Sequence, residues 1–115
     1  MAPQGHGRSQ NALAESVREY LDARMDRRVT LPELEAAFHT SGTQIKTTYK
    51  ACFGESLYAD TRARKMRAAA ALLCETELTV LEIAGNFGYD NASKFAAAFR
   101  AVMGASPTEY RTAQK

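Results

Sequence analysis

The sequence predicts an all-α domain in which a pair of short helices occurs twice. Apolar residues recur at helical spacing along most of the chain, and no stretch alternates with a period of two. A segment also repeats, shifted first by 49 residues (Thr30 to Thr79) and then by 50 (Ser41 to Asn91). Because stacked solenoids need at least about three repeats to bury a core, two copies indicate one module used twice.

Composition sets the limits of this interpretation. The chain has 115 residues, of which 45% are hydrophobic and 24% charged, as in an ordinary single globular domain. It has no secretory signal and no apolar run long enough to span a bilayer, so we expect a cytoplasmic protein with no membrane partner. Cys52 and Cys74 are expected to be reduced and half-buried, with a disulfide between them as the weaker alternative.

The net charge of +2 points to no partner by itself, but its distribution is uneven. Residues 41–74 carry six Lys and Arg against two acidic residues, whereas residues 11–40 are slightly acidic. A basic middle segment fits a surface that faces phosphate groups. For the arginines and lysine between 62 and 67, a solvated helix face is an equally good explanation.

The first unit is predicted to span about residues 10–54. The segment before it, 1–9, is rich in Gly, Pro and polar residues and is predicted to be disordered. Helical spacing and cap signals then predict three helices. Their predicted ranges are about 12–26 after Asn11, about 31–38 after Thr30 with Glu33, and about 42–53 after Ser41 with Gln44, ending at Gly54.

Four further helices complete residues 10–115. Ser56 begins a long connecting helix to about residue 75, and a second unit follows at about 79–113. Thr79 with Glu82, Asn91, and Ser106 followed by Pro107 supply the cap signals of that unit. They predict helices of about 80–87 and 92–103 and a last short helix.

Helices 31–38 and 42–53, joined by a turn at 39–41, have the layout of a helix-turn-helix. The outward face of the second helix would carry Thr43, Gln44, Lys46, Thr47 and Lys50. Such side chains suit base edges and phosphates in a DNA major groove. One such pair alone fits a corner of a helical bundle better, but its repetition favours DNA recognition.

The second unit repeats this arrangement. Leu81, Ile83 and Phe87 are expected to pack against Phe95 and Phe99. The outward face of helix 92–103 would then carry Ser93, Lys94, Ala97 and Arg100. The connecting helix would be roughly 27 Å long. That length approaches the separation of about 34 Å between successive major grooves on one face of DNA.

The stretch from about residue 30 to 111 resembles the DNA-binding domain of AraC/XylS-type transcription regulators. The resemblance is strongest in the second unit, with Glu82-Ile83-Ala84, Phe87-Gly88-Tyr89, Ser93-Lys94-Phe95, Phe99-Arg100 and the run from Gly104 to Arg111. In the first half of the stretch it rests on Leu34, Ser41, Ile45, Tyr49-Lys50 and Phe53-Gly54, and then, in the connecting helix, on Arg64, Met66, Ala69 and Leu72-Leu73.

The resemblance implies two helix-turn-helix units on a connecting helix that bind two adjacent major grooves of double-stranded DNA. Carried over by position, base contacts fall on Thr43, Lys46, Thr47, Ser93 and Ala97. Phosphate contacts fall on Gln44, Lys50, Lys94 and Arg100, aided by the N-termini of helices 42–53 and 92–103. Family members often have arginine at the positions of Thr47 and Ala97. Since alanine offers no hydrogen bond, we expect helix 42–53 to supply most of the sequence discrimination.

The family's effector-binding domain is not part of this sequence, which leaves open a fragment of a longer regulator or a small stand-alone one. We expect the isolated domain to be a monomer, with any dimer formed through such a domain. A helical protein-interaction module without DNA binding is the alternative function. No catalytic set, phosphate-binding glycine loop or metal-spaced cluster is recognisable, so we expect neither an enzyme nor a cofactor.

Overall fold

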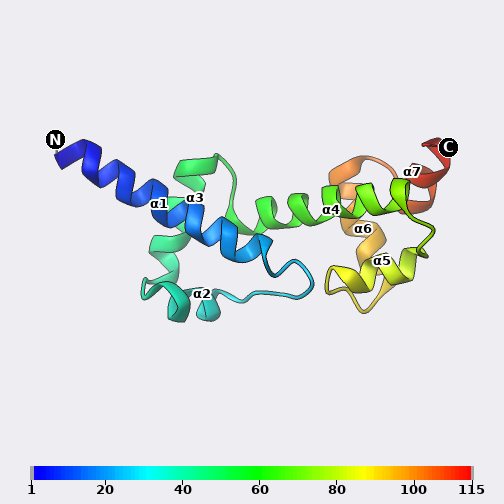
Figure 1. Ribbon diagram of the computed structural model, residues 1–115, viewed down its shortest axis with the longest axis horizontal. Coiled ribbons are helices and arrows are strands. Elements are labelled where there is room, and N and C mark those ends of the chain that lie inside the picture. The colour runs from blue at the N-terminus through cyan, green and yellow to red at the C-terminus, as the bar shows by residue number, and fades with distance from the viewer. Residues whose placement is uncertain (1, 115) are drawn as a thin grey trace. The chain divides into compact units, whose positions relative to one another are not determined.

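The computed structural model describes the backbone of residues 2–114 and the side chains of residues 11–114. Seven α-helices and no strand occur in these residues, which confirms the predicted all-α class (Figure 1). No helix in this described part is long and apolar enough to cross a membrane. The helices are α1 (Ala2–Asp22), α2 (Leu31–Phe38), α3 (Gly42–Phe53), α4 (Leu57–Glu75), α5 (Val80–Asn86), α6 (Ala92–Met103) and α7 (Pro107–Ala113).

Six of these helices lie within about a residue of their predicted ranges, because each begins at a recognisable cap. The exception is α1, which begins at Ala2 and ends at Asp22 instead of spanning about 12–26. Residues 2–9 are therefore helical, in contrast to the expected disorder of residues 1–9; Met1 lies outside the described residues. Pro3 stands in the first turn of α1, where its missing N–H costs no hydrogen bond, so it does not prevent this extension.

The chain forms two compact units. One contains the residues up to Arg24 together with Val29–Asp60, and the other contains Met25–Arg28 together with the residues from Thr61 onward. Helix α4 is continuous across the boundary, so its first turn belongs to the first unit and its remainder to the second.

The core of the first unit joins α1, α2 and α3. Its buried side chains are Val17 and Leu21 from α1, Leu34 from α2, and Ile45 and Tyr49 from α3. Leu31, Phe38 and Phe53 pack around them and are partly buried. Fully burying an apolar side chain of this size contributes about 1.5–3 kcal/mol, so this small cluster is enough to fix the pairing of α2 with α3.

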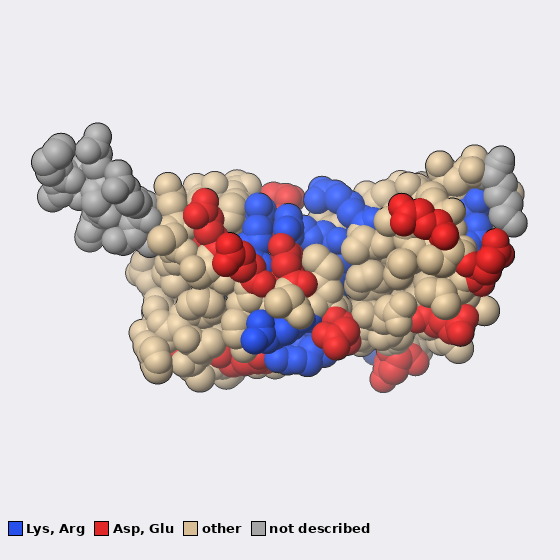
Figure 2. Space-filling view, viewed as in Figure 1, with Lys and Arg blue, Asp and Glu red and all other residues tan. Residues whose placement is uncertain are grey.

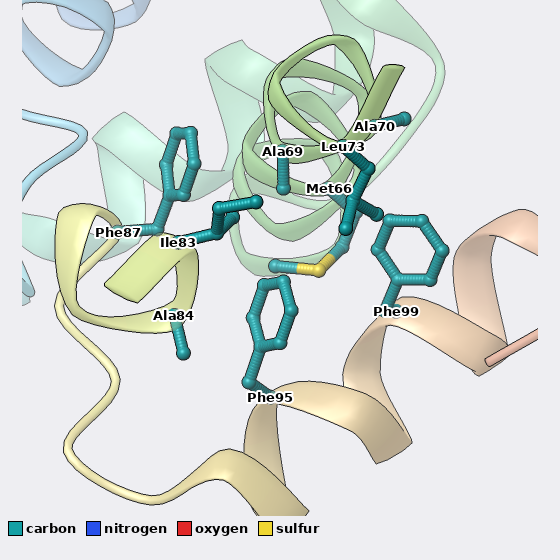
Figure 3. Packing of buried hydrophobic residues seen from close by; sticks show 9 residues of the cluster. All are labelled: Met66, Ala69, Ala70, Leu73, Ile83, Ala84, Phe87, Phe95 and Phe99. Atoms are coloured by element: carbon teal, nitrogen blue, oxygen red, sulfur yellow. The ribbon is translucent and has the colours of Figure 1, made fainter. Parts of the chain in front are cut away.

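The second core joins α4, α5 and α6, as Figure 3 shows. Ile83 of α5 points toward Met66 and Leu73 of α4, and Phe87, the C-cap residue of α5, belongs to the same cluster. Phe95 and Phe99 of α6 complete it. Leu81 was also expected in this core, but its side chain is 60% exposed. Leu81 and Ile83 are two residues apart on a helix, so they point to different faces, and the buried position belongs to Ile83.

The backbone repeats where the sequence repeats. Gly54 ends α3 with φ 80° and ψ −6°, and Gly104 ends α6 with φ 83° and ψ −2°, both in the left-handed conformation that favours glycine. In the turns before α3 and α6, His39 (φ 52°) and Gly88 (φ 83°) also have positive φ. The structure therefore contains one helix-turn-helix geometry twice.

Candidate nucleic-acid interface

Helix α3 has one buried and one exposed face. Ile45, Thr48 and Tyr49 are buried against the first core, so they fix which side of the helix faces outward. The five predicted contact residues on this helix are all exposed: Thr43, Gln44, Lys46, Thr47 and Lys50. Gln44 also donates from Nε2 to the Thr48 hydroxyl at 3.0 Å, which holds its amide along the helix.

The N-terminus of α3 is held by its own side chains. The Ser41 hydroxyl accepts a hydrogen bond from the Gln44 N–H at 3.1 Å, as the cap signal predicted. The Gly42 N–H donates to Glu35 Oε2 of α2 at 2.6 Å. This carboxylate lies where the partial positive charge of the helix end would otherwise attract an anion. A phosphate at this helix end would have to compete with Glu35 for the Gly42 amide.

Gly42 also explains the close approach of α2 and α3. It is buried, and a Cβ atom at this position would lie 2.6 Å from Leu31 Cδ2. Sequence reasoning missed both Glu35 and Gly42. The glycine directly after the Ser41 cap was the available signal, because a glycine there permits close packing of two helices.

Helix α6 carries four predicted contact residues, against five on α3. Phe95 and Phe99 are buried, and Ser93, Lys94, Ala97 and Arg100 are all exposed, as predicted. Asn91 caps the helix by accepting from the Lys94 N–H at 3.0 Å. Between the two cations, at Ala97, the surface offers only a methyl group.

Arg100 of α6 has a neighbour that the sequence analysis did not anticipate. Its Nη1 lies 3.5 Å from Glu109 Oε1 in an exposed ion pair. Glu109 also accepts from the Ser106 N–H at 2.9 Å and completes the capping box at the start of α7. These backbone and hydroxyl bonds from Ser106, with a smaller contribution from Arg100, lower the pKa of Glu109, so the carboxylate stays charged near neutral pH. A phosphate at Arg100 would have to compete with this carboxylate.

Neither the charges on the visible face nor the metal-binding side chain types in the described residues indicate a further site. Figure 2 shows acidic and basic side chains interspersed on the visible face, in keeping with the small net charge. Within the described side chains, no group of three or more His, Cys, Asp or Glu residues could hold a metal ion. Cys52 is half-buried, as expected, whereas Cys74 is exposed and not half-buried. Both are free thiols, so the alternative of a disulfide is not realised.

Known proteins similar to this chain are helix-turn-helix proteins, in agreement with the two helix-turn-helix units described above. Residues 34–113 match the helix-turn-helix domain family, a span that contains α3, α6 and both capping glycines. Among curated relatives, the HTH-type transcriptional activator AarP of Providencia stuartii is 27% identical over 108 residues, which cover 92% of this chain and 78% of the activator. The chain spans about a third of the length of other curated relatives that it matches.

Solved structures share the fold. The C-terminal domain of AraT, a response regulator from Geobacillus stearothermophilus, matches with a TM-score of 0.85 and 30% identity over 88% of this chain and 84% of that one. The DNA-binding domain of AdpA, solved in complex with a target DNA, has a TM-score of 0.78 and 25% identity over 88% of this chain and 90% of its own. A probable AraC family transcriptional regulator from Rhodopseudomonas palustris has a TM-score of 0.77 and 26% identity over 90% and 98%.

The family match covers well over half of the sequence, and the two exposed helices lie inside it. The chain belongs to this helix-turn-helix family, as a DNA-binding domain of the AraC type.

Proposed function

We propose that the chain binds duplex DNA sequence-specifically as part of a transcription regulator, with α3 and α6 entering two adjacent major grooves. Base contacts are assigned to Thr43, Lys46 and Thr47 on α3 and to Ser93 and Ala97 on α6. Phosphate contacts are assigned to Gln44, Lys50, Lys94 and Arg100. The proposal includes no catalysis. A cytoplasmic location and dimerisation through a further domain stay predictions.

One observation carries the proposal: all these residues are exposed on two helices whose opposite faces are buried. Their polar atoms and methyl groups are of the kinds that bind base edges and phosphates in a major groove. The solved complex of the AdpA domain with a target DNA shows that a protein of similar fold binds DNA.

We further propose that the two units contribute differently. Lysine and threonine on α3 offer hydrogen-bonding groups to bases, whereas Ala97 on α6 can only contact a thymine methyl. Glu35 at the N-terminus of α3 also weakens that helix end as an anion site. Helix α3 would therefore discriminate between sequences, while Lys94 and Arg100 of α6 mainly anchor the DNA backbone.

Selection of bound sites from random duplex DNA tests this function. We expect two half-sites centred about one helical turn of DNA apart, one strongly conserved and the other degenerate. Affinity for the selected site should fall steeply as salt rises, because phosphate contacts release counterions. A protein-interaction module would instead show no enriched sequence, and any binding to duplex DNA would be insensitive to salt.

A further inference from the structure

A buried carboxylate connects three helices of the first unit. Asp60 lies in the first turn of α4, is only 5% exposed, and accepts two hydrogen bonds at the same oxygen, Oδ2. One comes from Arg18 Nη2 of α1 at 3.0 Å, and the other from the hydroxyl of Tyr49 on α3. Arg18 Nε also lies 3.5 Å from that hydroxyl, so the three side chains form one closed set of contacts.

The same arginine holds a second residue of α3. Its guanidinium lies over the ring of Phe53, with 3.6 Å between Cζ and the ring centroid. Tyr49 and Phe53 are four residues apart and therefore lie on one face of the helix. Their rings also meet edge-on, with centroids 4.7 Å apart. Helix α3 is thus connected to α1 and to the start of α4 through its C-terminal half, while its N-terminal half carries the proposed base-contact residues Thr43, Lys46 and Thr47.

Hydrogen bonds and apolar contacts constrain a helix differently. Apolar packing is non-directional, and a helix can turn by some degrees about its axis without losing much buried area. A hydrogen bond weakens steeply once its angle departs from linear. A buried carboxylate that loses a donor also carries a large desolvation penalty. The Tyr49–Asp60–Arg18 set therefore fixes the rotation of α3 more narrowly than its apolar neighbours do.

The second unit provides an internal comparison. The 50-residue shift that relates Gly54 to Gly104 also relates Tyr49 to Phe99 and Asp60 to Tyr110. There the two positions form an aromatic pair, with ring centroids 5.5 Å apart and planes at 81°. At equivalent positions, α3 is held by a hydrogen bond from Tyr49 to a charged carboxylate, whereas α6 is held by an edge-on contact between two aromatic rings.

We propose that Asp60 is a positioning residue for sequence recognition: through Tyr49 and Arg18 it sets the orientation of α3, and with it the base pairs that Thr43, Lys46 and Thr47 reach. This inference rests on the proposed DNA-binding function. It assigns a role in recognition to a carboxylate that does not itself touch DNA.

The experiment compares Asp60→Asn and Tyr49→Phe with the unaltered chain on a panel of single-base-pair variants of the selected site. The half-site bound by α3 is identified as the one whose preference changes in Lys46→Ala. Tyr110→Phe serves as the matched control, because it alters the equivalent position of the second unit. Urea unfolding of each variant measures stability separately from recognition.

In each of the variants Asp60→Asn and Tyr49→Phe, we expect the preference for the correct bases in the α3 half-site to fall at least about fivefold. This is the size of effect expected from the loss of one base contact. The preference in the other half-site should not change. Tyr49→Phe removes the hydroxyl that donates to Asp60, and Asp60→Asn removes the negative charge that pairs with Arg18. Because both changes weaken the same set of contacts, the double variant should lose less than the sum of the two single losses. Tyr110→Phe should leave the α3 half-site unaffected.

The positioning role fails if discrimination between bases does not depend on Asp60 and Tyr49. Variants that are less stable but discriminate as well as the unaltered chain would reduce Asp60 to a purely structural role. An equal loss of affinity for every sequence would also overturn the positioning role. If Asp60→Asn does not fold, Tyr49→Phe, which removes one hydroxyl, still tests the positioning role. If the unaltered chain itself selects no sequence, the proposed function fails, and this outcome is separate from the other two.

Discussion

Arg111 of α7 donates from Nε to the carbonyl oxygen of Leu73 near the end of α4, at 3.0 Å. Its Nη2 donates to the carbonyl oxygen of Thr76 at 3.2 Å. The last carbonyl groups of a helix have no partner within the helix, and a cation near them also interacts favourably with the helix dipole. A side chain 38 residues further along the chain therefore caps the C-terminus of α4.

Replacing Arg111 by alanine removes both bonds and leaves carbonyl groups of α4 without this donor. We expect the free energy of unfolding to fall by about 1–3 kcal/mol. Urea unfolding followed by circular dichroism measures the change. Thr112→Ala, at an exposed position of the same helix, is the control and should change the stability by less than about 0.5 kcal/mol. Equal effects of the two changes would contradict the capping role.

Gly88 and Gly85 give a matched pair of substitutions to alanine. Gly88 has φ 83°, and a Cβ atom there would lie 3.0 Å from the Cα atom of Arg27, so Gly88→Ala should destabilise the second unit by more than about 1 kcal/mol. Gly85 lies within helix α5, and a Cβ atom there would meet nothing within 4 Å, so Gly85→Ala should stabilise by about 0.5–1 kcal/mol. Thermal unfolding of both variants tests the prediction, and a shift of the same sign in both would be inconsistent with it.

Lys46 is the residue on α3 whose removal should relax recognition most clearly. We expect Lys46→Ala to lose discrimination at one or two base pairs, at a cost of about 1–3 kcal/mol on the correct site and little on unrelated DNA. Affinity measurements on the selected site and its single-base variants give the answer. A uniform loss on all sequences would show that Lys46 contacts phosphate instead.

Arg100 should behave in the opposite way. Arg100→Ala is expected to weaken binding to every sequence and to reduce the slope of log affinity against log salt by about one unit. In the structure Arg100 lies 3.5 Å from the Glu109 carboxylate, which would compete with a DNA phosphate for it. The Glu109→Gln variant retains a capping side chain but lacks this negative charge, so it should bind DNA more tightly. Titrations at three or more salt concentrations distinguish these effects. An unchanged slope in Arg100→Ala would argue against a phosphate contact.

Tyr49 makes the stability depend on pH in the alkaline range. Burial, and after it the hydrogen bond to Asp60, raises the pKa of Tyr49 to about 12 from the ordinary 10.0. The unfolded chain then releases this proton before the folded chain does, so the stabilisation is complete below about pH 10 and is lost as the pH rises toward 12. Urea unfolding between pH 9 and 11.5 should show a steeper loss of stability for the unaltered chain than for Tyr49→Phe. Parallel curves would contradict the assignment.

Local signals in the sequence were sufficient for most of the helices. A cap, an apolar period and a terminal glycine all act within a few residues, so α2, α3, α4, α5, α6 and α7 could be placed without knowledge of the fold. The same periodicity separated buried from exposed positions on α3 and α6, and the predicted contact residues are indeed exposed. Leu81 is an exception: it was expected in the core but is exposed, because helical geometry places it on a different face from the buried Ile83.

The pairing of distant polar groups was decided by the tertiary structure. Asp60 with Arg18 and Tyr49, Glu35 with the Gly42 amide, and Arg111 with the end of α4 each join residues whose nearness depends on how the helices pack. The sequence shows that a side chain is charged, but it does not show whether water or another side chain forms hydrogen bonds with that charge. Most helices and their outward faces could therefore be deduced from the order of residues, because both depend on short-range periodicity and capping. Only the fold determined which charges hold the helices in place, because hydrogen bonds require donor and acceptor to meet in space.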